Sequence, residues 1–368
     1  MKIDDKTSHN SPSLRFPEFN GEWKNTTLEE CVDFLDGQRK PIKSDDRKGE
    51  KRLYPYYGAS GIIDYIDEYI FDGDYILLSE DGANIIDRNY RVAFIANGKI
   101  WVNNHAHVLQ PHKEMNINFL SEALERINYA IYNTGTTMPK LNQEICRKIN
   151  LNVPSLSEQN KIGNLLYLLN ERIATQNRLI EKLQSLIGGI AQHCIKEAIS
   201  GSMGIKLGDI CKITTGKLDA NAQVDNGLYP FFTCAEQPFK IDNFAFDTEA
   251  LLISGNGANL GYVNYYNGKF NAYQRTYVLD AFSENIQYIK WALKVLLPKR
   301  IAIEKSSSNT PYIVLSTLSD LRLPIPSKGN QCHMAELMQS LERKLSNQIA
   351  LKSSYNMLKQ YLLRQMFI

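Results

Sequence analysis

The sequence of 368 residues lacks the features that would commit it to a membrane or to a disulfide framework. No run approaches the roughly 18 uninterrupted apolar residues that a membrane-spanning helix needs. Residues 1–13 are polar and lack the apolar centre of a secretory signal peptide. The six cysteines form no Cys-x-x-Cys pair, which favours reduced thiols over disulfides or a zinc site. These absences predict a cytoplasmic globular protein.

Catalytic motifs and a strong net charge are also missing. The sequence has no phosphate-binding loop, no Gly-x-Ser-x-Gly elbow and no His-Glu-x-x-His pair. The glycine-rich segment 255–261 is spaced Gly-x-Gly-x-x-x-Gly, which favours a turn between strands over a dinucleotide-binding loop. Lys and Arg number 42 against 40 Asp and Glu, so bulk charge does not indicate a nucleic-acid partner. The search for a catalytic motif therefore returns mostly negatives.

The chain is instead built from two copies of one design. Three pairs of segments carry the repeat: 54–57 with 229–232, 79–84 with 254–259, and 151–154 with 323–326. Their offsets are 175, 175 and 172 residues, so the copies differ by small insertions and deletions in loops. Each copy starts with short strand-like runs separated by turn residues, and each contains one expected helix, near 118–132 and 286–297.

A long helix is expected at the end of each copy. Pro154 and Pro326 end the globular parts, and apolar residues at alternating spacings of four and three follow both prolines. This heptad pattern is typical of coiled coils. Gln176 and Gln348 are equivalent polar breaks in the two seams, and we expect them to fix the register of an antiparallel helix pair. The alternative is that each helix packs only on its own domain.

These patterns predict an α+β protein. It consists of two similar mixed α/β domains separated by two long antiparallel coiled-coil helices, related by a pseudo-two-fold axis. The expected parts are residues 1–156 for the first domain, 157–200 for the central helix, 201–326 for the second domain and 327–368 for the C-terminal helix.

The two copies carry different polar residues in one pair of equivalent segments, 103–107 and 273–277. The first copy carries Asn104, His105 and His107, and the second carries Gln274 and Arg275. Asn and Gln match adenine edges in the major groove and Arg matches guanine, so one scaffold position would read two different ligands. For the histidines, a structural role and a metal site stay open. Alternation on a strand would put both imidazoles on one face, and Glu114 follows.

Basic and hydroxyl-bearing segments supply further candidates for phosphate contacts, although solvated loops and simple turns remain the alternatives. The complete set of nucleic-acid-contact candidates is Arg39, Lys40, Asn84, Arg88, Arg91, Asn104, His105, His107, Thr136, Thr137, Lys140, Asn256, Asn259, Gln274, Arg275, Ser308, Asn309 and Tyr312.

Together these landmarks resemble the specificity subunit of a type I restriction-modification system. The resemblance rests on the opening segments 14–19 and 21–23, the 54–57 segment, the hydroxyl-rich turn before a proline, Glu158-Gln159 at the helix start, and the repeated long helix. It covers residues 14–368. In the second copy Asn330 replaces Glu158, a departure that we expect to affect helix capping only.

The resemblance implies two target-recognition domains, each reading one half of a split site on double-stranded DNA. It also implies assembly with two modification (methyltransferase) subunits and with restriction (ATP-dependent nuclease) subunits. S-adenosylmethionine, ATP and Mg would then bind only to those partners. Two alternatives remain: a metal-dependent enzyme that uses His105, His107 and Glu114, and a two-headed protein-interaction scaffold.

Overall fold

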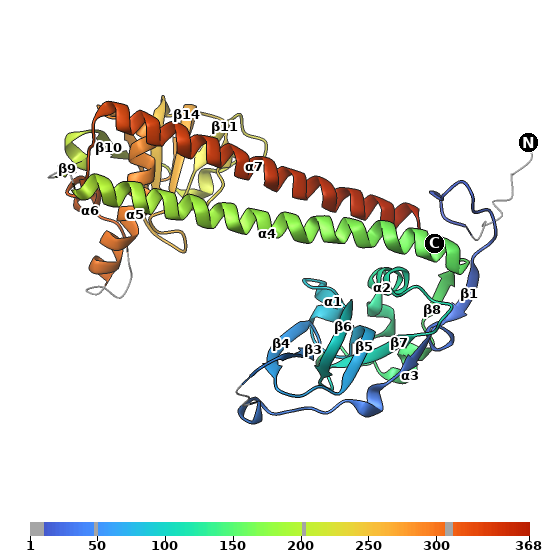
Figure 1. The fold of residues 1–368 in the computed structure, drawn as a ribbon. Coiled ribbons are helices and arrows are strands. Elements are labelled where there is room, and N and C mark those ends of the chain that lie inside the picture. The colour runs from blue at the N-terminus through green and yellow to red at the C-terminus, as the bar shows by residue number, and fades with distance from the viewer. Residues whose placement is uncertain (1–10, 48–50, 201–203, 306–311) are drawn as a thin grey trace, which may run out of the picture. The chain divides into compact units, whose positions relative to one another are not determined.

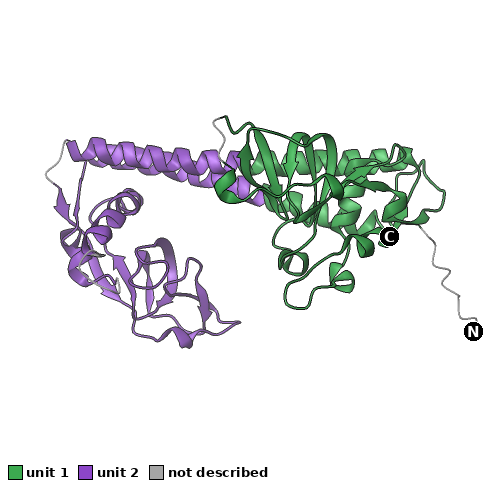
Figure 2. Ribbon diagram, turned by 90° about the horizontal axis from the view of Figure 1, so that it is seen from below, with its two compact units in different colours: residues 1–177, 351–368 green, residues 178–350 purple. Residues whose placement is uncertain are grey.

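The computed structural model describes residues 11–47, 51–200, 204–305 and 312–368. The chain divides into two compact units, which Figure 2 shows in different colours. Unit 1 comprises residues 1–177 and 351–368, and unit 2 comprises residues 178–350. Unit 1 is therefore discontinuous in sequence, because it combines the first part of the chain with its last residues. Unit 2 is one continuous segment.

A six-stranded sheet forms the centre of unit 1 (Figure 1). Its strands are β2 (Val32–Phe34), β3 (Tyr54–Gly58), β4 (Gly61–Ile66), β5 (Phe71–Ser79), β6 (Ala93–Val102) and β7 (Ala106–Pro111). They lie in the order β2-β7-β5-β6-β3-β4, and all neighbours are antiparallel except β3 and β6, which are parallel. A separate pair is β1 (Lys24–Thr27) with β8 (Asn150–Val153).

The helices of unit 1 are short apart from its shares of the two long helices. They are α1 (Asn84–Asp87), α2 (Ile117–Glu125) and α3 (Gln143–Arg147), with 3-10 turns η1 (Leu28–Glu30), η2 (Asp36–Gln38), η3 (Ser44–Asp46) and η4 (Tyr129–Tyr132). Asn116 caps α2, because its side-chain oxygen accepts the N–H of Phe119 at 3.0 Å. The single helix expected at 118–132 is thus two pieces, and Asn128 caps the second.

Unit 2 has the same sheet topology. Its strands are β10 (Lys212–Thr215), β11 (Tyr229–Phe232), β12 (Phe239–Ile241), β13 (Phe246–Ser254), β14 (Val263–Ala272) and β15 (Thr276–Asp280), with β9 (Ile205–Lys206) and β16 (Arg322–Leu323) as a separate pair. The order β10-β15-β13-β14-β11-β12 matches unit 1 strand for strand, including the one parallel pair, β11 with β14. The predicted α+β fold with two similar domains is confirmed.

The expected helix of the second copy is longer than the sequence predicts. The helical elements of unit 2 are α5 (Ile286–Lys305), α6 (Leu315–Ser319), η5 (Leu207–Asp209) and η6 (Ala220–Ala222). The sequence predicts this helix only to Leu297, and proline usually ends or kinks a helix. The helix nevertheless passes through Pro298. Leu293 and Leu297 are fully buried in the core of unit 2, and this packing anchors the helix on the N-terminal side of the proline.

The central strand of each sheet is buried on both faces. In unit 1, Ile76 and Leu78 of β5 belong to one hydrophobic cluster, and Leu77 belongs to another. Alternate side chains of a strand point to opposite faces, so a continuous apolar run fits a strand that is covered on both sides. The run Ala250–Ile253 of β13 is buried in the same way in unit 2.

Two long helices follow the two sheets. They are α4 (Leu156–Ser200) and α7 (Lys328–Gln365). In unit 1, Leu166 of α4 and Leu362 of α7 belong to one core. In unit 2, Ala191 of α4 and Met338 of α7 do so. Within each unit the early part of one helix therefore packs with the late part of the other, which is an antiparallel arrangement. Gln176 belongs to unit 1 and Gln348 to unit 2, and the approach of their amides stays a prediction.

A buried glutamine attaches each long helix to its own unit. The side-chain oxygen of Gln159 accepts the N–H of Asn116 at 2.9 Å, and its nitrogen donates to the carbonyl oxygen of Pro154 at 3.0 Å. The same arrangement recurs in unit 2 with Gln331, Asn285 and Pro326. The glutamine that occurs at both helix starts, Gln159 and Gln331, therefore has a structural role.

The preceding residue, Glu158, has a larger role than helix capping. Both of its carboxylate oxygens lie 2.7 Å from the guanidinium of Arg15, and its side chain is 1% exposed. A bidentate pair of this kind fixes two segments in a defined geometry. The expectation that Asn330 changes capping only is wrong, because unit 1 uses Glu158 to hold the segment around Arg15 against α4.

Candidate nucleic-acid interface

Three loops of unit 1 meet where strand β5 ends. The N–H of Glu80, directly after β5, donates to the carbonyl oxygen of His105 at 2.9 Å. The N–H of Leu141 donates to the carbonyl oxygen of Glu80 at 2.7 Å, and the N–H of Gly82 donates to that of Pro139 at 3.0 Å. These backbone hydrogen bonds bring together the β5–α1 loop, the β6–β7 turn and the segment before α3.

Unit 2 repeats this backbone frame. The N–H of Gly255, directly after β13, donates to the carbonyl oxygen of Arg275 at 2.8 Å. The N–H of Ile313 donates to the carbonyl oxygen of Gly255 at 2.9 Å. Gly255 therefore takes the place of Glu80, and Arg275 takes the place of His105. The glycine-rich segment 255–261 is a turn between β13 and β14, as its spacing predicts.

Five sequence candidates of unit 1 lie on this frame with exposed side chains. We call them loop cluster 1: Asn104, His105, Thr136, Thr137 and Lys140. The imidazole of His105 is 50% exposed, and its Nδ1 lies 2.8 Å from a carboxylate oxygen of Asp81. The Nζ of Lys140 lies 3.5 Å from a carboxylate oxygen of Glu80.

The corresponding set in unit 2 is loop cluster 2: Asn256, Asn259, Gln274, Arg275 and Tyr312. Gln274, Arg275 and Tyr312 are exposed. The two asparagines are partly buried and bond to Cys234: its thiol donates to Asn256 Oδ1 at 3.0 Å, and Asn259 Nδ2 donates to its carbonyl oxygen at 3.0 Å. Cys234 was not among the predicted site residues, because it belongs to no sequence motif. Ser308 and Asn309 lie outside the described residues.

The remaining candidates of unit 1 are engaged elsewhere. The side chain of Asn84 forms a local turn with the backbone of Tyr90. The guanidinium of Arg88 lies 3.0 Å from Glu125, and Lys40 accepts the indole N–H of Trp101 on its carbonyl oxygen at 2.6 Å. These contacts tie the candidates to unit 1 itself, and the Lys40 side chain stays exposed.

A charged cluster lies beneath loop cluster 1. The Nη1 of Arg39 donates to a carboxylate oxygen of Glu80 and to the carbonyl oxygen of Ala106, each at 2.7 Å. His107 is 1% exposed, and its Nδ1 lies 2.6 Å from Asp36. Burial opposes a charge on His107, but the hydrogen bond and the negative charge of Asp36 help to outweigh it and raise the pKa of His107 to about 10. His107 is therefore an imidazolium at neutral pH.

The metal-site alternative does not fit this geometry. His105 lies in the turn before β7 and not on the strand, so the alternation that would align it with His107 does not apply. Among the described residues, the group with suitable donor spacing is Asp36, Glu80 and His107, without Glu114. The guanidinium of Arg39 lies 2.7 Å from Glu80 and 3.5 Å from Asp36, so a cation of the protein already neutralises these carboxylates.

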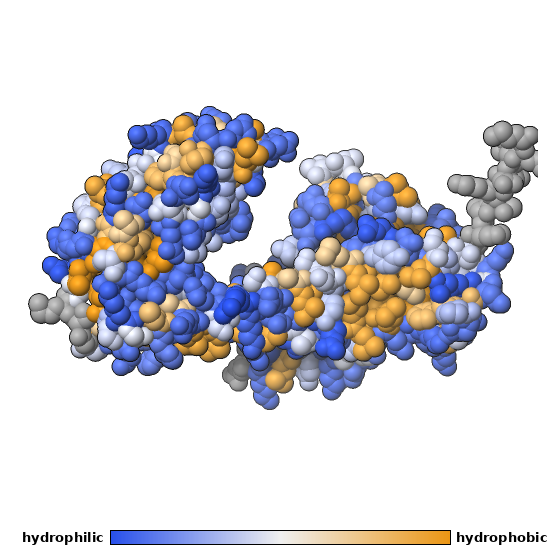
Figure 3. Space-filling model, turned by 90° about the horizontal axis from the view of Figure 1, so that it is seen from above, coloured by the Kyte–Doolittle hydropathy of each residue, from blue (hydrophilic) through white to orange (hydrophobic). Residues whose placement is uncertain are grey.

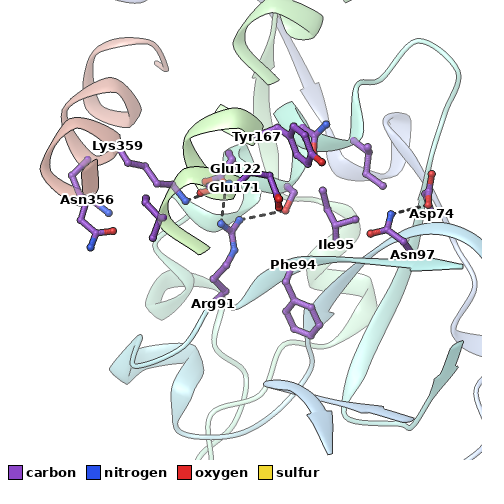
Figure 4. Close-up of a pocket in the computed structure, with 16 residues that line it drawn as sticks. Asp74, Arg91, Phe94, Ile95, Asn97, Glu122, Tyr167, Glu171, Asn356 and Lys359 are labelled. Carbon is purple, nitrogen blue, oxygen red and sulfur yellow. Dashed lines mark hydrogen bonds and ion pairs between the residues drawn. The ribbon is translucent and has the colours of Figure 1, made fainter. Parts of the chain in front are cut away.

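A polar pocket of about 780 Å³ lies between the sheet of unit 1, α2 and the two long helices (Figure 4). The carboxylate of Glu122 is at its centre, with one oxygen 2.7 Å from Arg91, 3.2 Å from Lys359 and 2.8 Å from Asn170. The sequence candidate Arg91 thus pairs with Glu122 inside unit 1. Lys359 interrupts the apolar seam of α7 because it reaches this buried carboxylate.

Within the described residues, no helix is both long enough and apolar enough to cross a membrane.

Comparison with protein families gives one match that covers most of the chain. The model described as type I restriction modification DNA specificity domain matches twice, at residues 20–185 and 200–352. The two matches correspond to the two copies of the repeat.

Curated relatives are type I specificity subunits. The EcoDI specificity subunit of Escherichia coli is 42% identical over 137 residues, 37% of this chain and 30% of that protein. The MjaVIII specificity subunit of Methanocaldococcus jannaschii is 23% identical over 381 aligned residues, 89% of this chain and 87% of that protein. The chain therefore spans about a third of the length of the EcoDI subunit. The alignment with the MjaVIII subunit is longer but has a lower identity.

Solved structures share the fold. The S subunit of a type I restriction-modification system from M. genitalium superposes with a TM-score of 0.75 at 19% identity, over 97% of this chain and 99% of that chain. A chain from a study of the assembly of the type I system has a TM-score of 0.51 at 16% identity and covers 94% of this chain and 97% of its own.

Proposed function

Since this chain belongs to the type I restriction-modification DNA specificity family, we propose that it is the DNA-reading subunit of such a system. Each unit would read one part of a bipartite site on double-stranded DNA, and the chain itself would be non-catalytic and act in the cytoplasm. Base edges in the major groove carry a distinct pattern of donors and acceptors, so a reader needs polar side chains on a rigid frame.

The observation that carries this proposal is the pair of equivalent loop clusters. The backbone frame around Glu80 recurs around Gly255, and the exposed residues on that frame differ between the units. His105 in unit 1 corresponds to Arg275 in unit 2. A constant frame with exchanged side chains is what two readers of different sequences require, because the frame positions the contacts and the side chains choose the bases.

We further propose two modification subunits and the restriction subunits as partners. S-adenosylmethionine, ATP and Mg would bind to those subunits. Partners that enclose the duplex would supply phosphate contacts that a chain of net charge +2 lacks. Exposed apolar residues on the long helices support a partner surface, because large apolar patches mark interaction sites. In unit 1 they include Leu168, 62% exposed, and Met357, 63% exposed. Figure 3 shows hydrophobic residues grouped between hydrophilic ones on the face that it displays.

Exchange of one recognition domain tests the proposal. Replacing residues 1–156 by the corresponding domain of another specificity subunit should change one half of the methylated site and leave the other half unchanged. The measurement is methylome mapping in cells that co-express the modification subunits. The reciprocal exchange of residues 201–326 is the matched control and should change the other half. Simultaneous change of both halves would contradict independent reading, and absence of any sequence-specific methylation with the unaltered chain would refute the function.

Replacing Arg275 by alanine should relax one position in one half-site. Its exposed guanidinium stands on the frame of unit 2, and a bidentate contact with guanine contributes about 1–3 kcal/mol of discrimination. Competition binding to site variants, with the assembled complex, measures this loss. His105→Ala is the matched control and should act on the other half-site. An Arg275→Ala complex that keeps its full preference at every position would show that Arg275 does not read DNA.

A further inference from the structure

One strand residue in each unit bonds to the carbonyl oxygen of an equivalent loop residue, and this strand residue is buried in unit 1 and partly buried in unit 2. In unit 1, His107 Nε2 lies 2.8 Å from the carbonyl oxygen of Leu141. In unit 2, the hydroxyl of Tyr277 donates to the carbonyl oxygen of Ile313 at 2.9 Å. Two side chains of different chemistry therefore make one contact at equivalent places.

Strand register establishes that the two places are equivalent. His107 of β7 is paired with Leu78 of β5, and Tyr277 of β15 is paired with Ile253 of β13. Leu78 and Ile253 each stand one residue before the last residue of their strand. The partner loops also correspond, because Leu141 and Ile313 both donate their N–H groups to the residue that directly follows the central strand.

The contact in unit 1 needs a second residue, Asp36. The two ring nitrogens of His107 face a carboxylate oxygen of Asp36 and the carbonyl oxygen of Leu141, and both of these oxygens only accept hydrogen bonds. His107 can satisfy both only by carrying a proton on each nitrogen. The other carboxylate oxygen of Asp36 accepts the N–H of Val108 at 2.9 Å, which fixes the carboxylate and thereby the ring.

Unit 2 makes the contact without an acid. Thr215 is paired with Tyr277 across β10 and β15. In unit 1, Phe34 of β2 pairs with Leu109 of β7. If this register is continued by two residues, Asp36 lies opposite His107, as Thr215 lies opposite Tyr277. A neutral phenol donates its proton without the help of a carboxylate. Unit 2, which has tyrosine in place of histidine, can therefore have Thr215 where unit 1 has Asp36.

We propose that His107 and Tyr277 are positioning residues for DNA reading, each clamping its recognition loop to its sheet. This proposal rests on the proposed function, because the clamped loops carry the candidate DNA contacts. Leu141 is held from both sides, by its N–H on Glu80 and by its carbonyl oxygen on His107. Lys140 of loop cluster 1 directly precedes Leu141, and Tyr312 of loop cluster 2 directly precedes Ile313. Loss of the clamp would free these side chains from a defined position relative to the bases.

Tyr277→Phe removes one hydroxyl and keeps the ring, so it isolates the clamp in unit 2. Amide hydrogen exchange of the full chain should accelerate by roughly 2-fold to 10-fold at residues 313–319, the effect of one net hydrogen bond, with the rest of unit 2 unchanged. In the assembled complex, methylome mapping should show a relaxed half-site for unit 2 and an unchanged half-site for unit 1.

A matched pair tests unit 1 by giving it the chemistry of unit 2. The double variants Asp36→Thr/His107→Tyr and Asp36→Thr/His107→Phe differ by one hydroxyl. The tyrosine form should keep slow exchange at residues 141–147 and a tight half-site, and the phenylalanine form should lose both. Equal exchange and equal half-site preference in the two forms would overturn the proposal.

The two readouts separate the clamp from the proposed function. Absence of sequence-specific methylation with the unaltered chain would refute DNA reading, and the exchange comparison would still measure the clamp. Acceleration spread evenly over the whole unit would overturn the proposal in favour of a general contribution to stability. Local acceleration with an unchanged half-site would also overturn it, because the clamp would then not position the reading residues.

Discussion

Replacing Glu122 by alanine should destabilise unit 1 by about 3–5 kcal/mol, the range found when one partner of a buried ion pair is removed. The Glu122 side chain is 3% exposed, and its carboxylate meets Arg91, Lys359 and Asn170 (Figure 4). Burial opposes the charge of Glu122, but Arg91 and Lys359 lower its pKa, so it is ionised at neutral pH. Without it, the two cations would face each other with no acid between them.

Hydrogen exchange at α2, compared with α5 in unit 2, measures this loss for each unit separately. Asp320→Ala in unit 2 is the matched control. Asp320 pairs with Lys206 at 2.7 Å, and the two side chains are 47% and 44% exposed, so its removal should have little effect on stability. A Glu122→Ala chain with exchange rates in α2 equal to those of the unaltered chain would show that the network contributes nothing to stability.

Replacing Phe367 by alanine should also destabilise unit 1 by about 3–5 kcal/mol, the usual cost of removing a buried aromatic ring. Phe367 is 6% exposed. Its ring stacks on Phe119 with centroids 5.1 Å apart, and it meets Trp23 edge to face at 6.1 Å. The guanidinium of Arg126 covers the ring at 5.0 Å. Trp23, from the N-terminal part of the chain, belongs to the same aromatic cluster. Residues near both ends of this sequence therefore form one core.

Chemical denaturation monitored by hydrogen exchange at α2 again gives the measurement. Tyr361→Ala, six residues earlier in α7, is the control, because Tyr361 is 51% exposed and its removal should cost little. Equal effects of the two substitutions would mean that the aromatic core does not depend on the C-terminal residues.

The sequence predicts the architecture well because its strongest signals are local or repeated. The heptad after Pro154 predicts α4, and the equivalent pattern after Pro326 predicts α7, since helix periodicity is visible within a few turns. The repeat predicts two similar domains without any knowledge of the strand order. The order itself depends on pairings between distant strands, such as β5 with β7, and no local pattern encodes them.

The candidate sites are harder to predict because their partners are distant in sequence. Arg39 belongs to a basic run typical of a phosphate contact, but its guanidinium is bound to Glu80, 41 residues away. Lys359 is visible only as a break in an apolar seam, and its partner Glu122 lies 237 residues away. The alternation rule fails for His105 because the chain turns before β7 starts. The shared contact of His107 and Tyr277 joins side chains that have no resemblance in sequence.

The division of the chain between the units has a consequence for synthesis on the ribosome. Unit 2 is the continuous segment 178–350, so its two shares of α4 and α7 are both available once residue 350 has emerged. Unit 1 needs residues 351–368, which carry Lys359 and Phe367, and these are made after unit 2. Domains fold as units when their residues are available. The second recognition unit should therefore close its core before the first, so the nascent chain folds in the order opposite to its sequence.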